Sequence, residues 1–107
     1  MELEPHFEAT VTLCEGRKQK LVGWRPDFGY KGEPAQWIIW PIEVLGLDGN
    51  VIPQLGPFPL KATVRMYILS EELRPMHKGR LHPGVEFTLN EGPHIIMDGV
   101  VTKILDL

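Results

Sequence analysis

Few residues of the chain have the types and spacing that catalysis requires. A hydrolytic site needs a nucleophile oriented by a base, or paired carboxylates in a pocket. Cys14, the only cysteine, has no histidine close to it in sequence, and Ser70 and the four histidines each stand alone. His77 and His82 lie five residues apart beside Met76, but a metal site needs three or four converging ligands. We therefore expect no enzyme activity, no metal and no cofactor; the enzyme alternative is a barrel-mouth site that uses His77 or His82.

A second pattern places basic residues among aromatic ones. Arg25 and Lys31 lie close in sequence to Trp24, Phe28 and Tyr30, and RNA-binding surfaces combine such cations with aromatic rings on which bases stack. The formal net charge of −3 works against general attraction to nucleic acid or to an anionic membrane. RNA is therefore the second partner that we consider.

The tryptophan-rich segment at residues 36–43, QWIIWPIE, favours a protein partner instead. Both phases of this expected strand are apolar, with Trp37 on one face and Trp40 on the other. Large aromatic residues and arginine are the usual anchors of protein interfaces. We expect a non-enzymatic binding module that contacts another protein, or a second copy of itself, through Trp37, Trp40, Arg25 and Phe28. The alternative is that an inserted hairpin buries both tryptophans.

The elements that position these residues read as short strands. Apolar and polar residues alternate at 6–14 and at 60–70, and 21–30 is a strand-like stretch that Pro26 bends or confines to a sheet edge. Asp48-Gly49 predicts a tight turn, and therefore an extra hairpin near 44–59. Residues 71–84 are the one helical fragment, but its prolines and glycine predict a turn or loop.

Residues 85–105 close the chain as a hairpin with its turn at 90–93. Val85, Phe87 and Leu89 share one face of its first strand, and the second strand is a nearly continuous apolar run. We expect that second strand to be buried deeply in a sheet. With about six main strands and almost no helix, the fold class is all-β, a small antiparallel barrel or sandwich.

The 107 residues allow one domain, spanning 1–107. A single cysteine cannot form an internal disulfide, which fits a reducing compartment. The sequence contains no basic-then-apolar signal segment and no apolar run of the roughly 20 residues that cross a bilayer. A cytoplasmic location and no membrane partner are therefore expected.

Four stretches also occur in a familiar order: FEA at 7–9, GWRPDF at 23–28, EG at 91–92 and GVVTKIL at 99–105. Together they resemble the C-terminal domain of elongation factor Tu. That domain opens with a similar F-E strand, carries a G-Y-R-P-Q-F motif and ends in a hairpin of the form R-E-G-G-R-x-V-G-x-G-V-V-x-K-V-L. The resemblance covers nearly the whole chain, and it implies a six-stranded antiparallel β-barrel.

In the elongation factor this barrel follows a GTPase domain and helps to grip the T stem of aminoacyl-tRNA. The family residues at the tRNA stem match Glu91 and Gly92, Lys31 falls where the family has an arginine, and Arg25 belongs to the second motif. The resemblance therefore implies an RNA contact through these four residues. The chain lacks the G-x-x-x-x-G-K-[ST] phosphate loop, so we expect no GTP binding and a barrel that stands alone.

Overall fold

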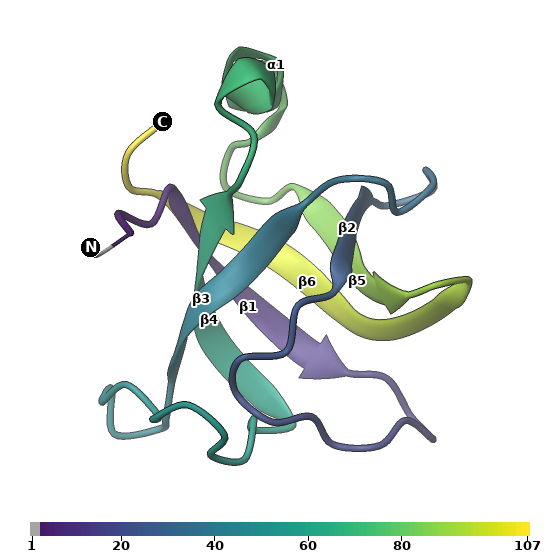
Figure 1. Ribbon diagram of the computed structural model, residues 1–107, viewed down its shortest axis with the longest axis vertical. Coiled ribbons are helices and arrows are strands. Elements are labelled where there is room, and N and C mark those ends of the chain that lie inside the picture. Colours follow the sequence, from purple (N-terminus) through teal and green to yellow (C-terminus); the bar gives the residue numbers. More distant parts are fainter. Residues whose placement is uncertain (1–2) are drawn as a thin grey trace.

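A computed structural model describes residues 3–107, which form one strongly curled antiparallel sheet (Figure 1). The first two residues of the predicted domain lie outside the described part. The sheet has six strands in the order β2-β5-β6-β1-β4-β3. Their bounds are β1 Phe7–Leu13, β2 Asp27–Tyr30, β3 Ile39–Leu45, β4 Lys61–Ile68, β5 Glu86–Glu91 and β6 His94–Ile104. The expected six antiparallel strands are confirmed, but the sheet is an open half-barrel rather than a closed barrel.

The sheet stays open because prolines stand where its two edge strands would pair. β2 meets the segment just before β3 at one bridge, in which Phe28 and Trp37 exchange N–H···O hydrogen bonds of 2.9 and 3.0 Å. Continuing that antiparallel register would set Pro26 opposite Ile39 and Trp24 opposite Pro41. Proline cannot donate a ladder hydrogen bond. The side chains of Pro26, Ile39 and Pro41 are buried instead. The two edge strands are therefore held together by side-chain packing and not by a hydrogen-bonded ladder, and we call the boundary between them the seam.

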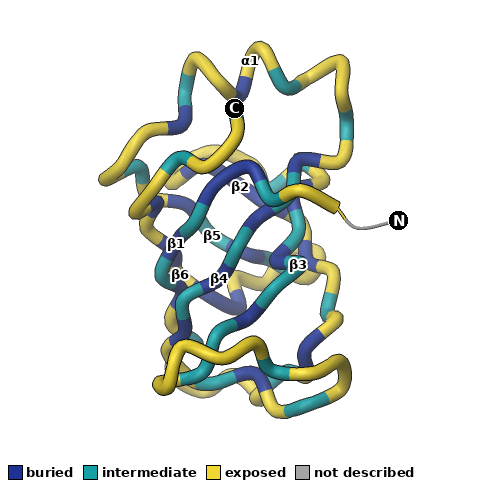
Figure 2. Tube along the Cα trace, turned by 90° about the vertical axis from the view of Figure 1, so that its left-hand side faces the viewer, coloured by how far each residue is buried: buried dark blue, intermediate teal, exposed yellow. Residues whose placement is uncertain are grey.

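Alternation builds the strands as the sequence predicts. Phe7, Ala9 and Val11 of β1 are fully buried, and the four inward positions of β4 are 0–5% exposed. Figure 2 shows the same pattern, with buried and intermediate residues alternating along the strands and exposed loops at both ends. One face of each strand therefore supplies the core.

Three phenylalanines from three different strands form the centre of that core. The rings of Phe28 and Phe87 stack with centroids 4.7 Å apart, and Phe7 meets both of them edge-on at 6.3 and 6.4 Å. Offset-stacked and edge-to-face pairs at these separations are the favoured aromatic geometries. The three rings join β1, β2 and β5 across the inside of the curl.

The closing hairpin is confirmed, but one expectation about it is wrong. Its two-residue turn starts at Gly92, whose φ of +56° favours glycine. Phe87 and Leu89 are buried as expected. β6 lies between β5 and β1, yet Ile95 and Val100 are 42% and 40% exposed. The second strand is not deeply buried, because no other layer of residues 3–107 covers the outer face of the sheet.

The predicted turn or loop at 71–84 is also wrong in part. A short 3-10 turn, η1 Glu71–Leu73, leads into a helix, α1 Arg74–Arg80. Pro75 lies in the first turn of α1, where its missing N–H removes no helical hydrogen bond. Within residues 3–107, no helix is long and apolar enough to cross a membrane.

The extra hairpin near 44–59 is present in a reduced form. Its tight turn is closed by hydrogen bonds from the Gly46 N–H to the Asn50 carbonyl and from the Ile52 N–H to the Val44 carbonyl. Pairing is limited to one bridge, between Leu45 and Val51. The Asp48-Gly49 signal was therefore read correctly, but the arms of the hairpin are too short to add a strand pair to the sheet.

Leu55, in the loop after this hairpin, has a φ of +67° and is 75% exposed. A left-handed conformation costs a leucine about 1–2 kcal/mol, whereas asparagine tolerates it. We expect Leu55→Asn to raise the free energy of unfolding by about 0.5–1 kcal/mol. Urea titration measures this change. Leu47→Asn, at a fully exposed leucine without a positive φ, is the control, and an equal gain in both variants would contradict the role of strain.

Candidate functional site

A small surface hollow lies beside the seam and has a volume of about 220 Å³. Arg25, just before β2, and Trp40, in β3, reach it from the two edges of the sheet, and the Arg25 guanidinium carbon lies 4.6 Å from the centroid of the Trp40 ring. We call this place the seam hollow. It is lined by Leu3, Gly23, Trp24, Arg25, Trp40, Pro41, Ile42 and Gln54.

Arg25 is the one charged side chain in the seam hollow. The ion pairs within residues 3–107 involve Lys20, Lys31, Arg65, Arg74 and Arg80, and in this described part Arg25 has no carboxylate partner. Stacking on an indole face leaves the edges of a guanidinium free to donate hydrogen bonds. An exposed arginine in this arrangement can bind a carboxylate or another acceptor in two-point fashion.

Trp24, on the other side of the hollow, is fixed by a carboxylate. Its indole N–H donates to Glu91 at 2.7 Å, and the Lys20 ammonium donates to both oxygens of the same carboxylate at 2.8 Å. The hydrogen bond from Lys20 lowers the pKa of Glu91 below its usual range. Glu91, an expected RNA contact, is therefore engaged within the chain, with Gly92 beside it in the turn.

The four expected protein-contact residues divide into a surface pair and a core pair. Arg25 and Trp40 come together on the outside, whereas Phe28 is 0% exposed and packs in the core. Trp37 lies on the opposite face from Trp40, edge-on to the imidazole of His77 with centroids 5.1 Å apart. Both indoles are half-buried, so the alternative in which the hairpin buries both is wrong.

The structure separates the expected RNA-contact residues. Lys31 pairs with Glu86 at 3.3 Å, at the start of β5, whereas Glu91 ends the same strand. The β2–β5 register sets Asp27 opposite Asn90 and Tyr30 opposite Phe87. Lys31 therefore lies one strand length away from Arg25 and from the Glu91-Gly92 turn.

His77 belongs to a buried cluster under α1. Its Nδ1 lies 2.7 Å from the Tyr30 hydroxyl, and its side chain is 1% exposed. Burial raises the pKa of Tyr30 to about 12, so the phenol keeps its proton and shares a hydrogen bond with the imidazole. Arg80 covers the Tyr30 ring and pairs with Glu33. These contacts dock α1 onto β2, while His82 is exposed elsewhere.

Two buried histidines make stability depend on pH. Burial lowers the pKa of His77 and of His6 from the usual 6.5, with a smaller contribution from a nearby arginine in each case. These two imidazoles therefore bind protons more readily in the unfolded chain than in the folded one. Their contribution to the free energy of unfolding is complete above pH 6.5 and is lost as the pH falls below that value. Urea unfolding at pH 7.5 and pH 5.5 should show a clear loss at the lower pH. Both values lie well above 4.5, the ordinary pKa of a glutamate, so the carboxyl groups with lowered pKa values stay largely ionised in both measurements.

The exposed His82 supplies the control for this effect. His82→Gln should leave the pH dependence unchanged, whereas His77→Gln should reduce it. A wild-type protein whose stability is equal at both pH values would contradict the assignment of two neutral buried imidazoles.

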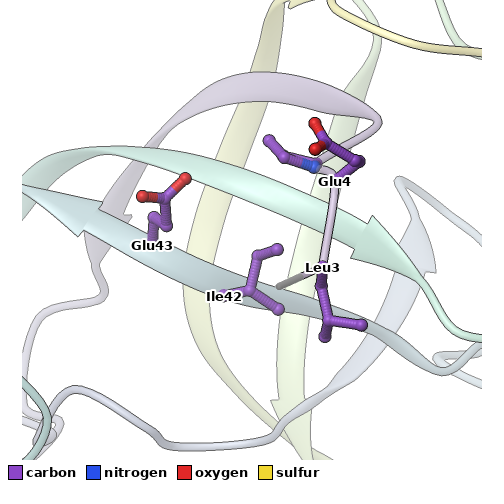
Figure 3. Close-up of a pocket in the computed structure, with 5 residues that line it drawn as sticks. Leu3, Glu4, Ile42 and Glu43 are labelled. Atoms are coloured by element: carbon purple, nitrogen blue, oxygen red, sulfur yellow. The ribbon is translucent and has the colours of Figure 1, made fainter. Parts of the chain in front are cut away.

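A second hollow adjoins the first and has a volume of about 380 Å³ (Figure 3). Leu3 and Ile42 line both hollows, and Glu4, Pro5 and Glu43 complete the second one. In Figure 3 the carboxyl groups of Glu4 and Glu43 lie on the same side of the Leu3 and Ile42 side chains, above them in this view. The two hollows thus form one strip along the outer side of β3.

Several residues of this strip carried no functional signal in the sequence. Leu3 and Glu4 precede the first strand, and only the tertiary structure brings them to β3. Gln54 enters the seam hollow from the 44–59 loop in the same way. Trp24, by contrast, was already noted in the sequence as an aromatic neighbour of Arg25.

Within the described residues, no three His, Cys, Asp or Glu side chains gather as a metal ion would require. No protein-family model matches the chain, and no curated protein matches it. The structure itself shows a half-barrel with Arg25 lying over the Trp40 ring beside its seam.

Proposed function

We propose that this chain is a non-enzymatic protein-binding module and that the seam hollow is its contact surface. The observation that carries the proposal is the stacking of Arg25 on Trp40, outside the core and without a carboxylate partner among residues 3–107. Tryptophan and arginine are the residues most enriched among interface hot spots. The flanking Trp24 and Ile42 give the same place apolar surface.

The resemblance to the C-terminal barrel of elongation factor Tu belongs to the same proposal. The order of the four sequence stretches supports it, together with the number of strands and a closing hairpin whose turn is Gly92-Pro93. Under this relation the chain keeps the scaffold of the barrel and uses it for a different partner. Contact with an RNA stem is the weaker alternative, because Glu91 is held by Lys20 and Trp24 while Lys31 lies at the far end of β5.

Affinity capture from the source cell tests the proposed function. Arg25→Ala and Trp40→Ala should each weaken binding of a captured protein by about 2 kcal/mol or more, as hot-spot truncations do. Lys103→Ala, at an exposed position of β6, is the control and should bind as the wild type does. A captured protein that binds all variants equally would contradict the seam hollow as the contact surface. Salt-sensitive retention of RNA in place of protein would favour the alternative.

A further inference from the structure

The strip of two hollows has unlike charges at its two ends. Arg25 stands at one end, beside Trp40. Leu3, which is 45% exposed, and the half-buried Ile42 lie in the middle, where the hollows join. Glu4 and Glu43 stand at the other end. Along β3 the surface therefore changes from basic to apolar to acidic.

The acidic end keeps an excess of negative charge after its own ion pairs are formed. Arg65 is shared between Glu8, at 3.6 Å, and Glu43, at 3.5 Å. Glu4 is exposed and has no cation at ion-pair distance within the described residues. Glu4 therefore adds a negative charge that no neighbouring cation balances among residues 3–107, while in the same part of the chain Arg25, at the opposite end, has no carboxylate partner.

We infer that the partner seated on this strip is a second copy of the same chain, related by a two-fold axis through its middle. This inference rests on the proposed function of the same surface. A strip that runs from positive through apolar to negative is complementary to itself when one copy is turned by half a revolution. Arg25 of each copy then faces Glu4 and Glu43 of the other, while Leu3 and Ile42 of both copies cover one another.

The contact is made by side chains and not by pairing of the two β3 edges. Pro41 has no N–H to donate, and both Pro41 and Ile39 are buried along the seam. A register shift between Pro41 and Glu43 bends the strand further away from regular pairing. The dimer therefore depends on two symmetric charge contacts and an apolar centre, which gives a weak, concentration-dependent association.

Sedimentation equilibrium of the full chain from about 5 µM to 1 mM tests this dimer, with charge reversals at its two ends. The wild type should pass from monomer to dimer over that range. Arg25→Glu and Glu4→Lys should each raise the dissociation constant about tenfold, since each reversal acts twice in a symmetric dimer and each of the two exposed ion pairs contributes modestly. Lys103→Glu changes the charge as Arg25→Glu does, but outside the strip, and should leave the dissociation constant unchanged.

Mixing the two variants gives the decisive measurement. In a two-fold dimer of one Arg25→Glu chain with one Glu4→Lys chain, both contacts join opposite charges, so the mixture should form a heterodimer more readily than either variant dimerises alone. The double variant should recover self-association close to that of the wild type. The preferred heterodimer does not follow if the two residues act only within their own chain.

A wild type that stays monomeric up to 1 mM would overturn the inference. So would a dimer that Arg25→Glu does not weaken, or one that mixing the variants does not restore. If the monomer instead captures another protein, and loses it on Arg25→Ala or Trp40→Ala, the protein-binding function stands and only the identity of the partner as a second copy fails.

Discussion

Replacing Phe28 by alanine is expected to lower the free energy of unfolding by about 3–5 kcal/mol, the cost of removing a buried phenylalanine. Its ring is 0% exposed, stacks on Phe87 at 4.7 Å and meets Phe7 edge-on. The truncation would leave a cavity where three strands meet, and the neighbouring rings can fill it only in part. Marginally stable domains have about 5–15 kcal/mol in all, so the variant should be close to unfolding at room temperature.

Urea titration followed by tryptophan fluorescence measures this loss. Lys103→Ala, on the solvent side of β6, is the control and should change stability by less than about 0.5 kcal/mol. A loss below about 1 kcal/mol for Phe28→Ala would contradict the central place of this ring in the core. Phe28→Ala should therefore lower the free energy of unfolding. Arg25→Ala, three positions earlier on the surface, should instead weaken partner binding.

Gly99→Ala is the second large expected effect, with a loss of about 1–3 kcal/mol from overpacking. A Cβ at this position would lie within 3.0 Å of three atoms of the Phe87 ring, and the two residues face each other in the β5–β6 register. The ring covers the bare backbone of the glycine, so an added methyl group has no free space. Phe87 cannot move away without disturbing its stack on Phe28.

A double-mutant cycle between Gly99→Ala and Phe87→Leu tests this cause. The leucine variant should tolerate Gly99→Ala better than the wild type does, with a coupling of about 1 kcal/mol or more. Gly79→Ala is the matched control, because no atom lies within 4 Å of its added Cβ and its place in α1 favours alanine. Purely additive effects of the two substitutions at 87 and 99 would contradict the steric explanation.

Much of the fold could be predicted from local patterns. The alternation in β1 and β4 identified the buried faces, because a side-chain period of two is a property of the extended backbone itself. Asp48-Gly49 and Gly92 marked tight turns for an equally local reason, since few residues adopt the conformations that such turns need. Pro26 was expected to bend its segment or to lie at a sheet edge, and it lies directly before the edge strand β2.

The errors arose where neighbours in space decide the outcome. The apolar run of β6 suggested deep burial, but Val100 and Ile95 are 40% and 42% exposed because none of the described residues forms a second layer outside the sheet. The prolines and glycine at 71–84 suggested a loop, yet α1 forms with Pro75 in its first turn and is held by the His77–Tyr30 contact. Phe28 follows Arg25 by three residues, so in an extended chain their side chains point to opposite faces, one inward and one outward.

The sequence by itself determined an antiparallel, strand-rich domain, its main turns and a list of residues able to make an interface. The tertiary structure decided which of them meet. Trp40 lies fifteen residues after Arg25. The two side chains meet because the curl of the sheet brings its two edges together, while Pro26 and Pro41 prevent those edges from pairing. Leu3 and Glu4 join the same strip only because the segment before β1 lies against β3. Contacts between distant segments follow from the packing of the whole core, and no local pattern of residues encodes them.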